Sequence, residues 1–212
     1  MKLHLTEIFY SLQGEAARVG LPTVFIRLSG CPLRCTWCDT PYSFSGGEPW
    51  TIDEILAEIA RYPTRQVCVT GGEPLAQKAC LPLLQALCEA GHEVCLETSG
   101  ALDIRNVDAR VSRIMDLKAP ASGESERNLW ANLEFLTPRD ELKIIIANRS
   151  DYDWACQKLQ EHQLAARCPV LFSPAQSSQE ARQLAEWILA DGLPVRFQLQ
   201  LHKLLWGNMQ GK

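Results

Sequence analysis

Short apolar runs alternate with amphipathic segments along most of the chain. Seven of these runs predict β-strands, at residues 24–28, 66–70, 93–97, 113–117, 142–147, 170–172 and 195–201. Helical segments between most of them are typical of parallel β/α units. The pattern predicts an α/β protein with six or seven parallel strands, in an open doubly wound sheet or an incomplete (β/α) barrel. The chain has 212 residues, fewer than the roughly 250 of a full eight-unit barrel. We expect residues 1–212 to form a single domain.

Two of the predicted helices have clear start signals. In residues 51–61, Thr51 and Glu54 match a capping box, and apolar side chains then recur with the helical period. The segment "SSQE" repeats this signal with Ser177 and Glu180, ahead of a helix predicted to extend to residue 188.

Composition narrows the class of protein. The net charge is −4, and the Lys and Arg residues are dispersed among acids, so no basic face for direct nucleic-acid binding is expected. No run of about 18 apolar residues predicts a membrane span, and the N-terminus lacks the apolar stretch of a signal peptide. We therefore expect a cytoplasmic protein. Nine cysteines in that setting favour metal binding or catalysis over disulfides.

Residues capable of chemistry follow the predicted strands. The carboxyl ends of parallel strands share one face, where active sites are built. A single cavity is therefore expected to bring together Cys31, Gly71 to Pro74, Thr98 to Gly100, Lys118, Ser173 to Gln176, and His202.

Three cysteines form the most specific motif. Cys31, Cys35 and Cys38 have the spacing C-x3-C-x2-C, and Gly30 indicates an exposed loop. Arg34 beside Cys35 favours the thiolate form. A closed zinc site would need a fourth ligand from a distant histidine, whereas a cubane iron-sulfur cluster with three thiolates keeps one iron open. The remaining cysteines are expected only to pack: Cys68, Cys80, Cys88, Cys95, Cys156 and Cys168.

This motif and "GGEP" at residues 71–74 resemble the radical S-adenosylmethionine (SAM) superfamily. The resemblance implies a 4Fe-4S cluster whose open iron binds SAM, and a 5′-deoxyadenosyl radical formed by reductive cleavage of SAM. Gly71 and Gly72 would approach the methionine ammonium group of SAM, although the same residues also suit a plain strand-to-helix turn.

Further segments narrow the resemblance. "FYSLQGE", "FIRLSGCPLRCTWCDT", "TGGEP", "ETSG" and "QLHK" are together similar to the 7-carboxy-7-deazaguanine synthase family, over essentially the whole chain. The resemblance implies a partial barrel of the radical SAM type, a homodimer, a magnesium ion, and an electron donor such as flavodoxin or ferredoxin. It also implies that 6-carboxy-5,6,7,8-tetrahydropterin undergoes ring contraction with loss of ammonia, in queuosine biosynthesis. Ala16, in place of the family's glycine, and "DLK" at residues 116–118 depart from the family pattern, and the ending "GNMQGK" gives Lys212 no clear role.

The resemblance also implies roles for individual residues. The cluster ligands would be Cys31, Cys35 and Cys38, and the magnesium ligand Thr40. The residues around SAM would be Trp37, Cys38, Asp39, Gly72, Glu73, Ser99, Asp116, Leu117, Lys118, Ser173, Pro174, Ala175 and Gln176. The substrate residues would be Leu12, Gln13, Gly14, Glu15, Arg27, Thr70 and His202.

Other interpretations of these residues stay open. Arg27 suits a substrate carboxylate, and strand alternation places it with Phe25, opposite Val24 and Ile26, but it also suits an ion pair. Glu15 could equally be a surface carboxylate. Ser99 could belong to a plain turn, and His202 could be a packed histidine without a ligand. No general base stands out. Rival functions are a glycyl-radical activase and a non-catalytic zinc-binding module.

Overall fold

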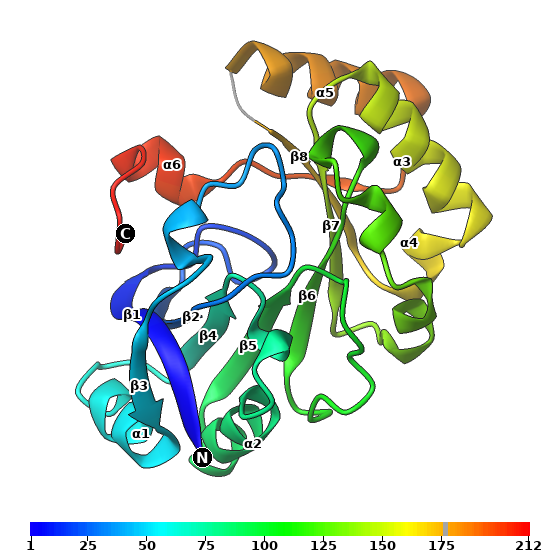
Figure 1. The fold of residues 1–212 in the computed structure, drawn as a ribbon. Helices are drawn as coiled ribbons and strands as arrows, with labels where there is room; N and C mark the ends of the chain where they lie inside the picture. The colour runs from blue at the N-terminus through cyan, green and yellow to red at the C-terminus, as the bar shows by residue number, and fades with distance from the viewer. Residues whose placement is uncertain (176–177) are drawn as a thin grey trace.

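The computed structural model describes residues 1–175 and 178–212. Within these residues a nine-stranded sheet has the order β3-β1-β2-β4-β5-β6-β7-β8-β9 (Figure 1). The strands are β1 (Lys2–Leu12), β2 (Pro22–Leu28), β3 (Glu48–Thr51), β4 (Gln66–Gly71), β5 (Glu93–Thr98), β6 (Ser112–Leu117), β7 (Glu141–Ile146), β8 (Val170–Pro174) and β9 (Arg196–Phe197). From β2 through β4 to β9 neighbouring strands are parallel, whereas β1 is antiparallel to β2 and β3. The sheet is mostly parallel and does not close, so the predicted incomplete barrel is confirmed.

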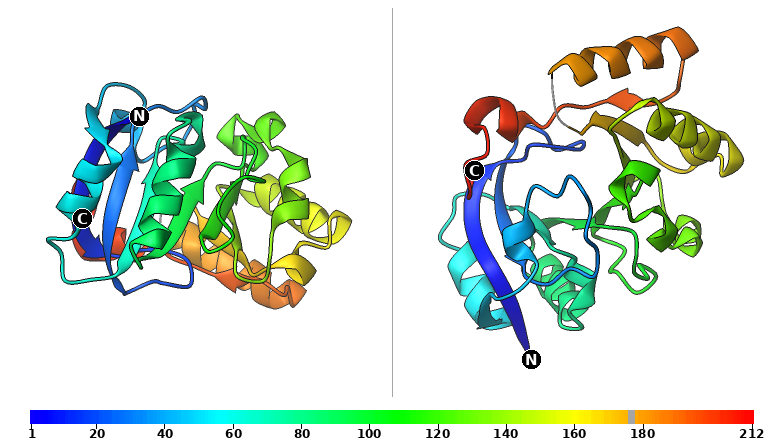
Figure 2. Two further views of the ribbon diagram at one scale, coloured as in Figure 1. Left: turned by 90° about the horizontal axis from the view of Figure 1, so that it is seen from below. Right: turned by 45° about the horizontal axis from the view of Figure 1, so that its top comes forward.

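Apart from α6, the α-helices lie outside the curved sheet (Figures 1 and 2). The α-helices are α1 (Ile52–Ile59), α2 (Cys80–Glu89), α3 (Arg149–Glu161), α4 (Leu164–Arg167), α5 (Ser178–Asp191) and α6 (Leu201–Trp206). The 3₁₀ helices are η1 (Pro41–Ser43), η2 (Pro74–Ala76), η3 (Pro120–Ser122), η4 (Ser125–Arg127) and η5 (Trp130–Phe135). Among the described residues, no helix combines the length and apolar character that a membrane span requires.

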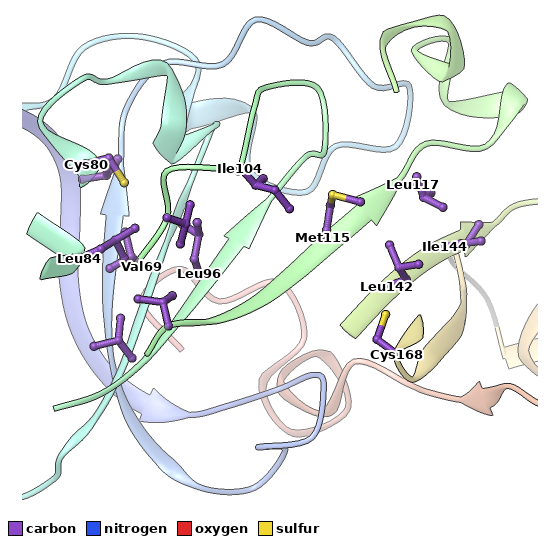
Figure 3. Close-up of a cluster of buried hydrophobic side chains, with 14 of the residues drawn as sticks. Val69, Cys80, Leu84, Leu96, Ile104, Met115, Leu117, Leu142, Ile144 and Cys168 are labelled. Atoms are coloured by element: carbon purple, nitrogen blue, oxygen red, sulfur yellow. The ribbon is translucent and has the colours of Figure 1, made fainter. Parts of the chain in front are cut away.

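The main hydrophobic core lies between the sheet and this outer layer of helices. Leu84 of α2 packs there with Val69 and Leu96 of the central strands (Figure 3). A smaller apolar cluster, which includes Phe25, Cys68 and Cys95, lies on the opposite, inner face of the sheet. The sheet therefore has one face for packing helices and one inner face toward the site.

Six of the seven predicted strands are confirmed within a few residues, as β2 and β4 to β8. The strand predicted at residues 195–201 is wrong in extent, because β9 covers only Arg196–Phe197 and α6 begins at Leu201. Both β9 residues are exposed and pair with β8 alone, so neither burial nor a second neighbour extends the strand. β1 and β3 were not predicted.

Both predicted helix starts fall near real helices. Thr51 caps α1: its hydroxyl accepts from the Glu54 amide at 3.2 Å, and the Glu54 carboxylate accepts from the Thr51 amide at 2.7 Å. The predicted capping box is thus confirmed. The second helix is α5, which begins at Ser178, while Ser177 lies outside the described residues.

A β-bulge in β1 decides which side chains reach the inner face. The register with β2 shifts between Leu5 and Glu7. Before the bulge Leu3 and Leu5 belong to the main core, and beyond it Ile8 and Tyr10 pack there instead. A bulge inserts one extra residue and so exchanges the faces toward which the later residues of the strand point. Glu7 and Phe9 are consequently directed to the same side as Arg27 and Phe25.

The loop between β1 and β2 crosses the amino-terminal ends of the strands. Its Ala17 amide donates to Glu141 of β7 at 2.9 Å, and Arg18 donates to the Glu93 carbonyl of β5 at 2.9 Å. Ala16 has a φ of 62°, in the left-handed region, and its amide donates to Gln198 at 2.7 Å. A left-handed backbone favours glycine, which accounts for the glycine expected at this position in the family. The loop and the chain after β9 together close the base of the open sheet.

All nine cysteines are free thiols. Cys68 and Cys95 lie in strands, Cys80, Cys88 and Cys156 in helices, and Cys168 just before β8, as expected. Burial raises the pKa of Cys168 to about 12, which leaves its thiol protonated and suited to packing.

Candidate functional site

A cavity of about 210 Å³ opens at the carboxyl ends of the parallel strands. Arg27 of β2, Thr70 of β4, Glu97 of β5 and Asp116 of β6 all line it from the last residues of their strands. The cysteine loop after β2 covers one side, and α6 borders another. The convergence predicted from the parallel strand order is thus seen in the structure.

The cysteine loop is anchored to the sheet and to η3. Gly30 has a φ of 91°, its amide donates to the Ser43 carbonyl at 2.8 Å, and its own carbonyl accepts from the Glu73 amide at 2.8 Å. Further along, the Thr36 amide donates to the Ser122 carbonyl at 3.1 Å. Cys31, Cys35 and Cys38 are partly exposed and line the cavity. Within the described chain they are not gathered into a ready single-ion site, but three free thiols on one loop are the donor set for an iron-sulfur cluster.

Lys118 is the cation that acts on the Cys31 and Cys35 thiols. Burial raises the pKa of Cys31 and of Cys35, and the positive charge of Lys118 opposes both shifts. Arg34, the neighbour expected to favour the thiolate, instead donates to the Cys31 carbonyl at 2.8 Å and lies 4.3 Å over the Phe44 ring. That expectation is corrected: Arg34 fastens the backbone of the loop.

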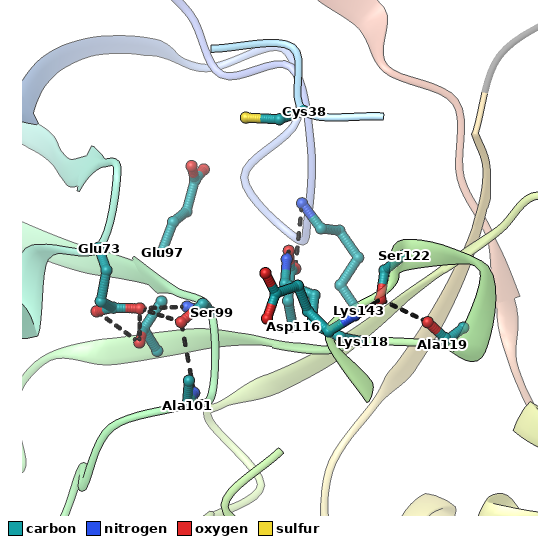
Figure 4. A network of polar contacts seen from close by, with 12 residues as sticks. Cys38, Glu73, Glu97, Ser99, Ala101, Asp116, Lys118, Ala119, Ser122 and Lys143 are labelled. Carbon is teal, nitrogen blue, oxygen red and sulfur yellow. Dashed lines mark hydrogen bonds and ion pairs between the residues drawn. The ribbon is translucent and has the colours of Figure 1, made fainter. Parts of the chain in front are cut away.

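The "GGEP" segment packs directly under the cysteine loop. A side chain at Gly72 would lie 2.3 Å from the Gly30 carbonyl oxygen and 2.9 Å from the Cys31 Cβ. Glu73 is fully buried, and its carboxylate accepts from Leu75, from Thr98 at 2.9 Å and from the Ser99 amide at 2.6 Å (Figure 4). Glu73 thus ties β4 to β5 beneath the cavity and does not line it.

A second cluster lies deeper between the strands. Glu97 accepts from the Thr70 hydroxyl at 2.8 Å and from the Gln13 side-chain Nε2 at 3.3 Å. Gln13 and Thr70 come from the β1–β2 loop and from β4, so one carboxylate of β5 holds both in position. No role was predicted for Glu97, although a carboxylate at a strand end was a usable signal.

Arg27 lies between aromatic rings. Its guanidinium carbon is 5.5 Å from the centre of the Phe9 ring and 5.9 Å from that of Tyr42, and Phe9 stacks on Phe25 at 4.8 Å. Glu7, directly across from Arg27 in the β1–β2 register, accepts from its Nε at 2.7 Å. The alternation of β2 that placed Phe25 and Arg27 together is confirmed. Glu7 and Phe9 were missed because β1 was missed.

Four charged side chains form a network on the other wall. Lys143 Nζ contacts Glu15 at 2.5 Å. It also contacts Asp116 at 3.3 Å, and Lys118 Nζ contacts Asp116 at 2.7 Å (Figure 4). Burial would raise the pKa of Asp116, but Lys118 and Lys143 more than offset this and hold the pKa below its usual range. Lys143 was also missed; a lysine inside the apolar run "ELKIII" was the available signal.

The C-terminal segment supplies the remaining wall. Gly14 faces His202 so closely that a side chain would lie 2.0 Å from its Nδ1, and burial lowers the pKa of His202. Lys203 pairs with Asp39 at 3.0 Å. Lys212, which had no clear role in the sequence, lines the cavity as well.

The cavity brings together most of the predicted site residues. Those that line it are Leu12, Gln13, Gly14, Glu15, Arg27, Cys31, Cys35, Trp37, Cys38, Asp39, Thr40, Thr70, Gly72, Ser99, Asp116, Lys118, Ala175 and His202. Among the described residues, those that do not line it are Glu73, Pro74, Gly100, Leu117, Ser173 and Pro174. Leu117 belongs to the main core, and Ser173 Oγ is buried without a hydrogen-bond partner in the described chain. Gln176 lies outside the described residues.

Known proteins share this chain's sequence and fold. The Radical SAM superfamily model matches residues 25–164. A 7-carboxy-7-deazaguanine synthase of Chlorobaculum tepidum is 45% identical over 96% of this chain and 94% of its own length. One from Koribacter versatilis is 42% identical, with 96% and 97% covered. The chain belongs to the 7-carboxy-7-deazaguanine synthase family of radical SAM enzymes. The crystal structure of QueE from Escherichia coli is also similar, with a TM-score of 0.80 and 27% identity over 95% of both chains.

Membership of the radical SAM superfamily implies a 4Fe-4S cluster and SAM as cofactors. The family also accounts for the partial barrel, since this chain and the E. coli structure match over nearly their full lengths.

Proposed function

We propose that this enzyme converts 6-carboxy-5,6,7,8-tetrahydropterin into 7-carboxy-7-deazaguanine, with loss of ammonia, as a step of queuosine biosynthesis. The observation that carries the proposal is the meeting of the three-thiol loop with Arg27, Gln13 and Thr70 in one cavity. The relatives that match over most of both chains have the corresponding name.

Cys31, Cys35 and Cys38 would hold the cluster. With SAM bound and one electron from a reductant, the cluster would supply a 5′-deoxyadenosyl radical, with release of methionine, for removal of a hydrogen atom from C6 of the pterin. The chain's own part is placement and exclusion of water. Gly72 leaves room beside the cysteine loop, and Glu73 fixes Ser99 at the cavity edge. The residues proposed around SAM are Trp37, Asp39, Gly72, Ser99, Asp116, Lys118 and Ala175, all of which line the cavity.

Arg27 would hold the substrate carboxylate. Its Nε is occupied by Glu7, and among the described residues no hydrogen bond involves its two terminal nitrogens, which are the fork that pairs with a carboxylate. Gln13, Thr70 and Glu15 also line the cavity and would contact the aminopyrimidine ring. Leu12, Gly14 and His202 line the same cavity and would complete the substrate site.

Thr40 would provide one ligand of a magnesium ion. Its hydroxyl makes no capping bond to η1 and lies 3.8 Å from the Cys38 sulfur, at the cavity wall. Magnesium prefers hard oxygen ligands and retains several waters, so one hydroxyl and the substrate oxygens suffice. We further propose a homodimer and a flavodoxin or ferredoxin as electron donor, both on the family resemblance, and a cytoplasmic location, on the sequence pattern.

Anaerobic reconstitution tests the proposed function. The enzyme would be loaded with iron and sulfide and incubated with SAM, a reductant, magnesium and the pterin, and the products identified by mass spectrometry. We expect 7-carboxy-7-deazaguanine, no product from Cys35→Ala, and a lower rate after magnesium is chelated. Absence of a deazaguanine from enzyme with a loaded cluster would reject the substrate, and a native zinc ion in place of iron would reject the cofactor.

A further inference from the structure

Lys143 is a buried cation in the cavity wall. It lies in the middle of β7, only 9% of its surface is exposed, and it lines the cavity. Its Nζ contacts Glu15 Oε2 at 2.5 Å. The same Nζ contacts Asp116 Oδ1 at 3.3 Å (Figure 4). Glu15 comes from the β1–β2 loop and Asp116 from β6, so one ammonium group joins two segments that are far apart in sequence.

The two carboxylates have different additional partners. Asp116 also pairs with Lys118, the cation beside the cysteine loop, at 2.7 Å. The second oxygen of Glu15 accepts from Gln200 Nε2 at 2.5 Å, and the Glu15 amide donates to Gln13 Oε1 at 3.2 Å. With Lys118 and Lys143 opposing Glu15 and Asp116, the formal charges of the four side chains cancel.

The fold itself gives little reason for this lysine. Removing a buried ion pair in favour of apolar side chains is often neutral or stabilising, because the desolvation cost is large. Lys143 points to the inner face of the sheet, where its cross-strand neighbour on β8, Leu171, is a fully buried hydrophobic residue, so an apolar side chain would suit that position. The reason for a charged side chain at this position therefore lies in the cavity and not in the stability of the fold.

We propose that Lys143 is a positioning residue that ties Glu15, on the pterin side, to Asp116, on the SAM side, and so fixes the two reactants relative to each other. The inference rests on the proposed function. It requires that loss of Lys143 weaken pterin binding and separate SAM cleavage from pterin turnover, while the three thiols keep the cluster.

Lys143→Met tests this, with Lys143→Arg as the conservative variant. A double variant, Asp116→Ser with Lys143→Met, removes one charge of each sign and keeps the wall neutral. Lys158→Met is the matched control, because Lys158 pairs with Glu161 on the outer surface. The readouts are calorimetric pterin binding, KM and kcat, iron content, thermal unfolding, and the ratio of 5′-deoxyadenosine to deazaguanine.

We expect Lys143→Met to raise the pterin Kd and KM about 10- to 100-fold, as for a lost hydrogen bond between charged groups. The ratio of 5′-deoxyadenosine to deazaguanine should rise, with iron content unchanged. Lys143→Arg should recover part of the affinity, the double variant should recover unfolding temperature but not affinity, and Lys158→Met should behave as the wild type.

Unchanged Kd and product ratio in Lys143→Met would overturn the inference alone. So would recovery of wild-type Kd by the double variant, because charge balance and not position would then be what matters. If loaded wild-type enzyme neither bound the pterin nor formed a deazaguanine, the proposed function and this inference would fail together.

Discussion

Arg27 shows how single contacts prepare a side chain for a ligand. Its Nε donates to Glu7 at 2.7 Å, and the Tyr42 hydroxyl donates to the same Glu7 oxygen at 3.0 Å. The ion pair is largely buried, with 14% of the Arg27 side chain and 16% of the Glu7 side chain exposed. An arginine held at Nε by a neighbour and flanked by rings has little freedom left, so its terminal nitrogens are preorganised for a carboxylate.

Glu7→Ala should therefore weaken substrate binding. We expect the pterin KM to rise about tenfold, and the free energy of unfolding to fall by about 1 to 3 kcal/mol, because a partly buried guanidinium loses its partner. Glu7→Gln still accepts a hydrogen bond from Arg27 Nε, so its KM and its free energy of unfolding should lie between those of the wild type and those of Glu7→Ala. Steady-state kinetics and thermal unfolding measure these changes.

Glu58→Ala is the matched control, since Glu58 pairs with the exposed Arg61 in the outer layer and exposed pairs contribute little. It should change neither quantity by much. A Glu7→Ala enzyme with wild-type KM would show that Arg27 needs no support from Glu7.

At the scale of elements, the parallel strands could be predicted and the antiparallel ones could not. Continuous apolar runs such as residues 66–70 and 142–147 predict a strand whichever face each side chain points to. The apolar period of β1 changes phase at the bulge between Leu5 and Glu7, which hides the strand, and β3 is four residues with Pro49 at the sheet edge. The same holds for the site. Cavity residues at the ends of predicted strands could be predicted, whereas Glu7 and Phe9 could not, because their strand β1 was not predicted.

The junction between the cysteine loop and "GGEP" makes a second prediction. In Gly72→Ala the new Cβ would meet the Gly30 carbonyl oxygen at 2.3 Å, and backbone cannot yield as a flexible side chain does. We expect the loop to shift and the iron and sulfide content after reconstitution to fall well below that of the wild type. Turnover should fall in proportion.

Gly91→Ala is the control for this variant. Gly91 has a φ of 82° with open space around its Cβ position, so the substitution should cost about 1 kcal/mol of stability without loss of iron. Full cluster loading in Gly72→Ala would contradict the role given to this junction.

At the scale of the whole molecule, the β1–β2 loop and the chain after β9 close the base of the open sheet. Their sequences do not predict this position. The β1–β2 loop reaches β5 and β7 across the base, and the Leu201 amide donates to the Gly14 carbonyl at 2.9 Å, which joins α6 to that loop. These contacts depend on residues nearly two hundred positions apart, as between Ala16 and Gln198. The class of fold and most of the cavity were predictable, whereas Lys203 lies at the cavity only because this closure brings α6 there.

The fate of one hydrogen atom tests the proposed reaction most directly. Cluster-loaded enzyme would be given SAM, reductant, magnesium and pterin that has deuterium at C6, under anaerobic conditions. We predict deuterium in the 5′-deoxyadenosine and formation of 7-carboxy-7-deazaguanine. Unlabelled 5′-deoxyadenosine, or label transfer without any deazaguanine, would contradict the proposed reaction.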